Sequence, residues 1–361
     1  MKIAIITGNT SPNSGLGRFS KEVVQELRNQ GEEIVVLSES GDSDINIESH
    51  TKIGSIFRNL ITARKAVRKI NVVHALDAWP FAIYGLFAVI GTQKKLYISS
   101  VGTYSVPPRH FSLKRFLMRS AYRRASHIFC ISAYTQKRIS ERLPFKCSMS
   151  VVYLATTPLP KSDAHAISDI RVRYHITPDM RVVLTVGGIK DRKGQLDTLR
   201  AVIEVREKRP DLVYVIVGDI SDSAYIDEIK KEAKKHDAEN AYRIVSNASS
   251  DKELAAWYSI ADVFALTSNT KGNHFEGFGL VFLEAAHFGV PGVGTTDCGI
   301  EDAIINNETG LLVAQRDTHA IALAILKILS NHQLFSMKVR TFASKFSWQA
   351  TVERYRSVYY N

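Results

Sequence analysis

Two glutamates frame the stretch Glu276-Gly277-Phe278-Gly279-Leu280-Val281-Phe282-Leu283-Glu284. An apolar run at residues 263–266 precedes it and predicts a strand. After it, the apolar spacing becomes helical and stops at Gly289 and Pro291, which is typical of a helix end. A strand, a glycine-containing turn and a helix start place backbone N–H groups around residues 277–281. Those donors favour an anionic group, phosphate above all.

The residue types inside this stretch suit a ligand that combines phosphate with sugar. Gly277 and Gly279 let the backbone approach a ligand without an intervening Cβ. Glu276 is expected in the loop and Glu284 about two turns into the helix, where each carboxylate could accept hydrogen bonds from sugar hydroxyls. A nucleotide sugar offers both groups. The same local pattern also fits an ordinary buried turn whose two glutamates are solvated.

Length and composition limit which architectures and compartments are possible for the chain. With 361 residues and 45% hydrophobic content, the chain is long for one core and suits two domains. The three cysteines are scattered and odd in number, which indicates a reducing compartment. Residues 1–8 predict a buried strand and a glycine turn rather than a secretion signal. The longest uncharged run, residues 78–93, is shorter than the roughly 20 residues that span a bilayer, so we expect a buried helix there.

The net charge of +11 is unevenly distributed. Residues 1–165 contain 23 Lys or Arg and 11 Asp or Glu, whereas residues 166–361 contain 24 and 25. The whole positive excess therefore lies in the first half. An excess confined to one half suggests an acidic partner for that half.

The order of predicted elements indicates two α/β domains. In the first half, strands are predicted at residues 2–6, 34–37, 72–75, 96–99, 127–131 and 149–153, and helices at 17–30, 55–69, 81–90, 113–124 and 133–143. This alternation favours a parallel sheet covered by helices. A proline-containing break at residues 156–163 separates it from further strands at 182–186, 213–217, 242–245 and 263–266. We expect domains at 1–160 and 166–340, with ligands at the carboxyl ends of the strands.

Five further motifs occur in a specific order around the two glutamates. They are VLTVGG at 183–188 with RKG at 192–194, VIVGD at 215–219, LAAWYSIADVF at 254–264, TGLLV at 309–313 and FSW at 346–348. Together with the Glu-x7-Glu stretch they resemble the retaining family-four glycosyltransferases of the GT-B fold, over nearly the whole chain. The resemblance implies two doubly wound, Rossmann-like domains facing across a cleft. It also implies that a C-terminal helix, residues 346–361, packs back on the first domain.

The resemblance assigns roles in the second domain. Lys193 falls on the family's diphosphate-binding lysine, and Arg192 beside it suits the same group. The family often has an arginine five residues before that lysine; this chain has Gly188 there. We expect Gly188 to line the donor site and Arg192 or Lys190 to compensate for the missing charge. Glu276 would orient the donor sugar and Glu284 would hold the ribose.

Other loop residues complete the expected donor site. Asn273 and His274, immediately before the stretch, are candidates for sugar or phosphate contacts, with simple solvation as the alternative. The base and the sugar are expected to be recognised by residues 247–251 and 267–273. The expected co-substrate is a nucleotide diphosphate sugar, with no other cofactor.

Candidate residues in the first domain are less specific. Gly15, Gly17 and Arg18 open the first predicted helix; they could cradle phosphate or form a plain turn, and Ser20 excludes a dinucleotide fingerprint. The resemblance favours a loop facing the donor phosphate and the acceptor. The family often has a histidine in the loop at 99–105, but this chain has Gly102 and Thr103 there, which we still expect to line the site. His74 is a weak substitute, with a structural role as the alternative.

A metal-dependent alternative is weak. Asp42-Ser43-Asp44 could mark a metal-dependent transferase of another fold, but no cluster of further ligands accompanies it. Arg, Lys and helix dipoles would neutralise the diphosphate instead, so no metal is expected.

A basic stretch in the first half suggests a membrane partner. Residues 109–124 hold six cations and no acid: Arg109, Lys114, Arg115, Arg119, Arg123 and Arg124. Phe111, Leu113 and Phe116 lie among them. The combination is typical of a segment that docks on anionic lipid, although a solvated helix face is the common alternative.

The sequence therefore predicts a retaining hexosyltransferase. Its acceptor is expected to be a saccharide, as a lipid-linked intermediate of a bacterial surface polysaccharide (lipopolysaccharide, O-antigen or capsule). Its expected location is cytoplasmic, peripheral on the inner face of the membrane. The alternatives are a nucleotide-sugar epimerase of the same fold and a non-catalytic binder of anionic membrane or nucleic acid. Recognisable nucleic-acid modules are missing from the sequence, so no nucleic-acid partner is expected.

Overall fold

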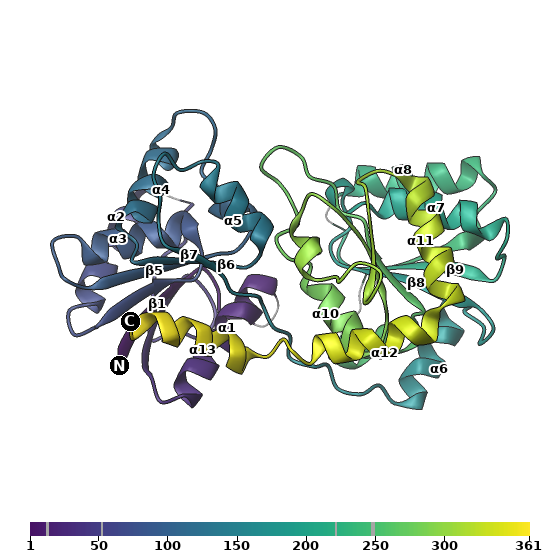
Figure 1. The fold of residues 1–361 in the computed structure, drawn as a ribbon, viewed down its shortest axis with the longest axis horizontal. Coiled ribbons are helices and arrows are strands. Elements are labelled where there is room, and N and C mark those ends of the chain that lie inside the picture. Colours follow the sequence, from purple (N-terminus) through teal and green to yellow (C-terminus); the bar gives the residue numbers. More distant parts are fainter. Residues whose placement is uncertain (12–13, 52, 221, 247–249) are drawn as a thin grey trace. The chain divides into compact units, whose positions relative to one another are not determined.

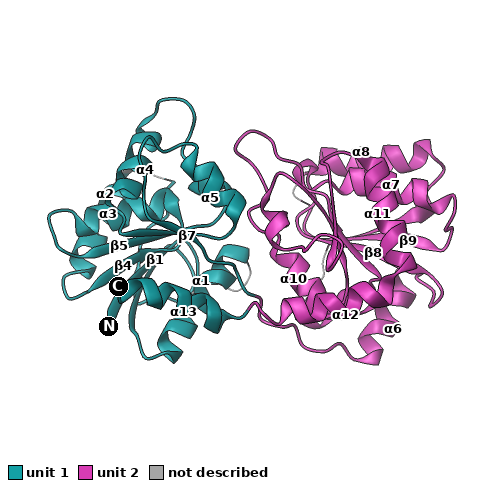
Figure 2. Cartoon of the chain, viewed as in Figure 1, with its two compact units in different colours: residues 1–155, 347–361 teal, residues 156–346 magenta. Residues whose placement is uncertain are grey.

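The computed structural model describes residues 1–361 apart from 12–13, 52, 221 and 247–249 (Figure 1). The chain forms two compact units (Figure 2). Unit 1 comprises Met1–Ala155 and Ser347–Asn361, and unit 2 comprises Thr156–Phe346. Each unit is built around one parallel sheet with helices packed against it, the arrangement that alternating strands and helices produce.

Unit 1 contains a seven-stranded sheet in the order β3-β2-β1-β4-β5-β6-β7. The strands are apolar and largely buried, as expected when helices cover a parallel sheet. Their bounds are β1 (Lys2–Thr7), β2 (Glu33–Ser38), β3 (Ile45–Asn46), β4 (Val72–Ala75), β5 (Lys95–Ser100), β6 (His127–Cys130) and β7 (Met149–Val151).

The helices of unit 1 begin at clear capping signals. The side chains of Ser14, Ser112 and Ser132 each accept a hydrogen bond from a backbone N–H three residues later. The helices are α1 (Gly15–Asn29), α2 (Ile53–Ala66), α3 (Ile83–Val89), α4 (Leu113–Arg124), α5 (Ala133–Ser140) and α13 (Trp348–Tyr359), with shorter turns η1 (Ala78–Ala82) and η2 (Thr103–Ser105).

Unit 2 contains a six-stranded parallel sheet in the order β10-β9-β8-β11-β12-β13. The strands are β8 (Arg181–Val186), β9 (Leu212–Val217), β10 (Tyr242–Val245), β11 (Val263–Leu266), β12 (Gly292–Thr295) and β13 (Gly310–Val313). The helices are α6 (Ala164–Arg173), α7 (Gln195–Arg206), α8 (Ser223–Lys235), α9 (Asp251–Ile260), α10 (Leu280–His287), α11 (Thr318–Ser330) and α12 (His332–Ala343), with 3₁₀ turns η3 (Asp191–Lys193), η4 (Glu239–Ala241) and η5 (Gly299–Asp302).

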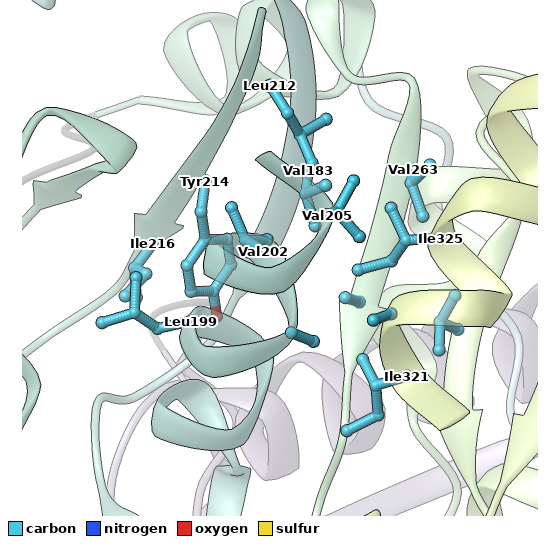
Figure 3. Close-up of a cluster of buried hydrophobic side chains, with 14 of the residues drawn as sticks. Val183, Leu199, Val202, Val205, Leu212, Tyr214, Ile216, Val263, Ile321 and Ile325 are labelled. Atoms are coloured by element: carbon cyan, nitrogen blue, oxygen red, sulfur yellow. The ribbon is translucent and has the colours of Figure 1, made fainter. Parts of the chain in front are cut away.

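The core of unit 2 lies between the sheet and helices α7 and α11. Figure 3 shows Leu199 and Val202 of α7 and Ile325 of α11 pointing toward strand residues such as Val183 and Ile216. All five side chains are fully buried. Close packing of this kind fixes the strands, and therefore the loops at their ends.

Both sheets reverse their strand order once. In unit 1 the reversal lies between β1 and β4, and in unit 2 it lies between β8 and β11. In open α/β sheets, ligands bind at the carboxyl ends of the strands next to such a reversal. The loops that follow these four strands are therefore the places to look for function.

By length and composition, none of the helices in the described residues could span a membrane alone. The bent pair α11 and α12 meets those criteria only when its two helices are taken together, with an angle of 94° between them.

Candidate functional site

Two loops meet at the strand reversal of unit 2. Because β8 pairs with β11, the loop after β8 and the loop after β11 leave the same edge of the sheet. The Asn269 N–H donates to the Arg192 carbonyl at 2.7 Å, and Thr267 Oγ1 donates to the Gly194 carbonyl at 2.8 Å. Gly194 has φ 73°, and a Cβ there would lie 2.0 Å from the Thr267 carbonyl oxygen. Only glycine allows this close approach of the two loops.

Glu276 is the centre of the contacts between these loops. Its Oε2 accepts hydrogen bonds from Lys193 Nζ at 2.7 Å and from Arg192 Nη1 at 3.2 Å. The Glu276 side chain is only 15% exposed. Burial by itself would raise the pKa of Glu276, but the charges and hydrogen bonds of Lys193 and Arg192 lower it to about 2. Glu276 is therefore a carboxylate at neutral pH, and it can hold hydroxyl donors but cannot supply a proton.

A third cation belongs to the same cluster. The pKa of Lys190 is lowered by burial first and then by the nearby charges of Arg192 and Lys193, while Glu276 raises it. Lys193 and Arg192 thus contact the Glu276 carboxylate, and Lys190 lies within range of its charge. The surplus of positive charge suits an anion that carries more than one negative charge, such as a diphosphate.

The glycine-containing loop is fixed by the turn η5. The Gly299 N–H donates to the Glu276 carbonyl at 2.8 Å, and a Cβ at Gly299 would lie 1.9 Å from the Gly277 carbonyl oxygen. The Phe278 ring is buried, 6.1 Å from the ring of Phe346. Gly279, with φ 81°, then caps α10, so Leu280 and Val281 are its first two residues. The backbone of residues 277–281 is held in place beside Glu276.

Glu284 lies about one turn into α10, because the left-handed Gly279 delays the start of the helix; the expected position two turns in is wrong. Glu284 Oε2 accepts a hydrogen bond from the hydroxyl of Tyr258, on α9, at 2.7 Å. The sequence did not single out Tyr258. Only the packing of α9 against this region brings its hydroxyl to Glu284.

The remaining expected donor residues lie around this centre. The Gly188 carbonyl accepts a hydrogen bond from Gln195 Nε2 at 3.2 Å, so this part of the loop after β8 is tied to the start of α7. The half-buried Asn273 and the exposed His274 occupy a turn closed by backbone hydrogen bonds between Lys271 and His274. Part of the segment expected to recognise the base, residues 247–249, lies outside the described residues.

In unit 1, Gly15, Gly17 and Arg18 form the first turn of α1, next to the end of β1. A Cβ at Gly17 would lie 2.0 Å from the Ser11 carbonyl oxygen, whereas a Cβ at Gly15 would meet nothing within 4 Å. Gly17 is therefore explained by close packing. Gly15 leaves open space beside the helix start, which is compatible with a ligand there.

Gly102 and Thr103 lie near the strand reversal of unit 1. Gly102 adopts φ 80° and leads into η2, which begins at Thr103. Ser105 Oγ and the Ala78 N–H donate to Asp77 Oδ1, at 2.9 and 2.7 Å. Burial raises the pKa of Asp77 to about 6, although these hydrogen bonds oppose the rise. Asp77 thus anchors the loop that contains the expected acceptor residues.

The structure corrects the hypothesis that His74 replaces the missing loop histidine. Its ring is fully buried; Nε2 lies 2.9 Å from Ser99 Oγ, and Nδ1 lies 2.5 Å from the hydroxyl of Tyr359 on α13. Burial lowers its pKa to about 3. Both ring nitrogens are engaged inside unit 1, so His74 joins β4 to α13 and cannot serve a substrate.

Of the six cations at residues 109–124, Arg109 and Arg123 are exposed, and the other four are only partly exposed. Lys114 Nζ lies 4.8 Å from the Trp79 ring centre, and Arg119 donates twice to the Arg142 carbonyl. Arg124 donates to the Thr92 and Lys94 carbonyls, Arg115 to the Arg109 carbonyl, and Arg123 lies over the Phe145 ring. These contacts are with uncharged carbonyls and rings, so the segment keeps its positive charge, and its docking on anionic lipid stays a prediction.

The most exposed large side chains at this end of α4 are instead apolar. Phe111, Leu113 and Phe116 are 89%, 71% and 60% exposed. They stand among the arginines of the basic segment. An apolar patch of this kind, bordered by cations, is typical of a surface that contacts another molecule or a membrane.

The Asp-x-Asp sequence has a local structural role. The Asp44 carboxylate accepts from the Val36 N–H at 2.8 Å and pairs with Arg28 at 3.4 Å. Across the residues that the structure describes, no group of three or more His, Cys, Asp or Glu side chains is placed to hold a metal ion.

Two doubly wound parallel units are the architecture of the GT-B class of glycosyltransferases. In this chain, cations and a carboxylate lie at the strand reversal of the second unit. Residues 167–343 match the family model of glycosyl transferases group 1, and residues 13–156 match that of glycosyltransferase family 4. The chain therefore belongs to the family-four glycosyltransferases of the GT-B fold.

Curated relatives and solved structures agree with this assignment. The chain is 29% identical over 260 residues to a GDP-mannose-dependent alpha-(1-6)-phosphatidylinositol monomannoside mannosyltransferase of Mycolicibacterium smegmatis, covering 70% of this chain and 66% of that protein. It is 31% identical over 181 residues to glycogen synthase of Mycobacterium tuberculosis, covering 49% and 42%. The chain thus spans from about four tenths to two thirds of the length of these relatives. The crystal structure of Anabaena Alr3699/HepE in complex with UDP has a TM-score of 0.83 at 17% identity, covering 99% of both chains.

Proposed function

We propose that the protein transfers a hexose from a nucleotide diphosphate sugar to a saccharide acceptor, with retention at the anomeric carbon. One observation supports this most strongly: Glu276 is held between Lys193 and Arg192 at the strand reversal of unit 2. The cations suit the diphosphate, and the carboxylate suits the sugar hydroxyls. Both parts of a nucleotide sugar would therefore find partners within one cluster.

The named relatives support the donor class without fixing the base. The Anabaena structures contain UDP or UDP-glucose, and the M. smegmatis relative is GDP-mannose-dependent. These donors share a diphosphate that joins a hexose to a nucleoside. The charge cluster around Glu276 would recognise that shared part, so UDP and GDP donors are the first to test.

In the proposed step, the bond between the sugar C1 and the β-phosphate oxygen breaks while the acceptor oxygen bonds to C1 on the same face. The departing diphosphate oxygen takes the acceptor proton. Negative charge grows on the diphosphate, where Lys193, Arg192 and the backbone N–H groups of residues 277–281 would stabilise it. Glu276, always ionised at neutral pH, would orient the sugar, and Glu284, positioned by Tyr258, would hold the ribose.

We further propose a lipid-linked acceptor and peripheral attachment to an anionic membrane through unit 1. Phe111, Leu113 and Phe116 could enter the lipid interface while the surrounding arginines attract its charge. The M. smegmatis relative acts on a phosphatidylinositol monomannoside, which is a lipid acceptor. A lipid-linked intermediate of a bacterial surface polysaccharide would likewise present a saccharide acceptor at a membrane.

The experiment that tests the donor site is a thermal-shift titration with UDP, GDP, ADP and their hexose conjugates. We expect one nucleotide to raise the melting temperature of the protein by mass action. Lys193→Ala should reduce that nucleotide's affinity by at least about tenfold, because it removes a charge-assisted bond to the diphosphate. Glu276→Gln should keep the shift with the nucleotide but lose hexose transfer.

Lys208→Ala is the matched control, since Lys208 is exposed just beyond the far end of α7 and its removal changes the charge equally. Equal shifts for the Lys193→Ala and Lys208→Ala proteins would contradict the assignment of the diphosphate site. Conversion of a nucleotide sugar without any acceptor would favour the epimerase. Salt-sensitive nucleic-acid binding without any nucleotide-sugar shift would favour the non-catalytic binder.

A further inference from the structure

One asparagine ties together the two loops of the candidate donor site. Asn269 follows β11 by three residues and is buried. Its backbone N–H donates to the Arg192 carbonyl at 2.7 Å, and its side-chain Nδ2 donates to Asp197 Oδ2, in the first turn of α7, at 2.9 Å. Asn269 therefore connects the loop that leads to Glu276 with the turn η3, which contains Arg192 and Lys193, and with the helix that follows η3.

The partner of this asparagine, Asp197, is itself supported from α8, which packs against α7. Asp197 Oδ1 lies 3.9 Å from Arg200 Nη1, and Arg200 Nη2 donates to Glu232 Oε2, on α8, at 3.0 Å. This hydrogen bond lowers the pKa of Glu232 and raises the pKa of Arg200, so the pair is ionised at neutral pH. Asp197 thus has a charged and well-anchored neighbour.

The side chain of Asn269 depends on Asp197. Among the residues that the structure describes, Asn269 Oδ1 is buried and has no hydrogen-bond partner, so the bond from Nδ2 to Asp197 is the one that fixes the amide. Removing the acceptor would leave a buried amide unsatisfied, and the loop would have to shift to hydrate it. Because the backbone N–H of the same residue holds the Arg192 carbonyl, such a shift would also displace η3.

We propose that Asn269 and Asp197 are positioning residues for recognition of the donor diphosphate. They act through η3: their hydrogen bonds keep Arg192 and Lys193 beside the loop of Glu276, so both cations are preorganised for the diphosphate. The inference rests on the proposed function, since it takes these cations as the diphosphate site. Losing the pair should therefore weaken binding of a nucleoside diphosphate more than binding of the monophosphate, which lacks the second phosphate.

Calorimetric titration of the full chain with UDP and UMP tests this role, with GDP and GMP replacing them where the thermal-shift titration selects guanine. Asp197→Ala should weaken UDP binding by about fivefold to tenfold and UMP binding by less than about twofold, because only the second phosphate depends on η3. Asp197→Asn should keep most of the UDP affinity, since its amide oxygen can still accept from Asn269.

An exchange of the two side chains makes the test independent of the alanine variant. Asn269→Asp alone should weaken UDP binding, because two carboxylates would face each other. Adding Asp197→Asn to the same chain should restore that binding, because the hydrogen bond forms again with the donor on the other side. Failure of the double variant to recover UDP affinity would overturn the proposal, and so would equal losses for UDP and UMP.

Asp262→Ala is the matched control. The Asp262 side chain is 15% exposed, against 14% for Asp197, and it accepts from Arg181 and from the Val182 N–H at the opposite end of β8. Its loss should lower the melting temperature without changing UDP affinity. A loss of UDP affinity as large as that in the Asp197→Ala protein would show that general loosening of unit 2, rather than positioning of η3, explains the effect.

The Lys193→Ala protein separates this inference from the proposed function. In that background, Asp197→Ala should cause a smaller further loss of UDP affinity than in the parent, because one of the cations that it positions is gone. A further loss of full size would overturn the positioning role. An unchanged UDP affinity in the single Lys193→Ala variant would instead contradict the diphosphate site itself.

Discussion

His74 and Asp77 lie three residues apart at the end of β4, and burial displaces their pKa values in opposite directions along the pH scale. The pKa of His74 falls from 6.5 to about 3, so between these values the unfolded chain binds a proton that the folded chain excludes. The folded state is therefore destabilised relative to the unfolded state as the pH falls through this range. The pKa of Asp77 rises from 3.8 to about 6, so its contribution is lost as the pH rises through that range.

The effects of the two residues on the free energy of unfolding should therefore offset each other between pH 4 and 6. Single substitutions should reveal how the contribution of each residue changes with pH. The stability difference between the parent and His74→Gln should grow by about 1.4 kcal/mol for each unit of rising pH, and that between the parent and Asp77→Asn should shrink by a similar amount. Urea unfolding of the three proteins at pH 4.5 and 6 measures both slopes. Parallel pH profiles for all three would show that neither group titrates on unfolding.

At the scale of single residues, the sequence indicated which side chains belong to the candidate site, but it did not indicate all of their hydrogen-bond partners. Glu276, Lys193 and Arg192 lie together because strand neighbours in a parallel sheet end at the same edge. That relation follows from the doubly wound fold that the family resemblance implies. The burial of His74 could not be predicted, because it depends on Tyr359, which is distant in sequence. The pairing of Glu284 with Tyr258 depends in the same way on how α9 packs.

At the scale of elements, the site depends on the fit between the 276–279 loop and the turn η5. Replacing Gly299 by Ala would place a Cβ 1.9 Å from the Gly277 carbonyl oxygen, so the loop must move. We expect the protein to fold with some loss of stability and to bind the donor nucleotide at least about tenfold more weakly, because the backbone donors around Gly277 would be displaced. Thermal-shift titration with the nucleotide measures this loss.

Gly54→Ala is the control for this substitution, because a Cβ there would meet only the end of the Arg58 side chain, at 3.9 Å. It should leave nucleotide affinity unchanged and stabilise α2 by up to about 1 kcal/mol. An unchanged nucleotide affinity in the Gly299→Ala protein would show that the loop position does not matter for binding.

The regular elements were predicted well where their patterns were long or strongly apolar. The strands at residues 72–75, 242–245 and 263–266 and the helix at 113–124 have the predicted bounds, and the helix expected at 346–361 spans 348–359. Three strands were not predicted. β3 has two residues, and β12 and β13 have four each and include glycine, so their identity comes from pairing with neighbouring strands rather than from local preference. The bonds of Arg119 and Arg124 to backbone carbonyls had no local signal either.

At the scale of the whole molecule, unit 1 is completed by a helix from the other end of the chain. Tyr355 and Tyr359 of α13 are buried against His74 and Phe129, and the Tyr97 hydroxyl donates to the Val358 carbonyl at 3.2 Å. Arg356 Nε donates to Glu32 at 2.7 Å, and the Glu32 side chain is only 1% exposed. Unit 2 makes none of these contacts.

Removing residues 347–361 should therefore unfold unit 1 selectively. The loss of two buried tyrosines alone is worth about 3–5 kcal/mol each by analogy with aromatic-to-alanine changes, which is comparable with the whole stability of a domain. Without Arg356, the buried Glu32 would also lose one of its charged partners. Unit 2 retains its whole sheet and the Glu276 cluster, so it should stay folded and should still be stabilised by the donor nucleotide.

Limited proteolysis with and without the nucleotide separates the two units. In the truncated protein, we expect rapid cleavage within residues 1–155 and a surviving fragment of unit 2 that the nucleotide protects further. Tyr355→Phe is the milder comparison, because it keeps the ring and removes only the hydroxyl that bonds to Ser99, at a cost of about 1 kcal/mol. If the truncated protein resisted cleavage in unit 1 as well as the full chain does, the contacts of α13 would be dispensable, and His74 would have to be kept buried by β4 and its neighbouring strands alone.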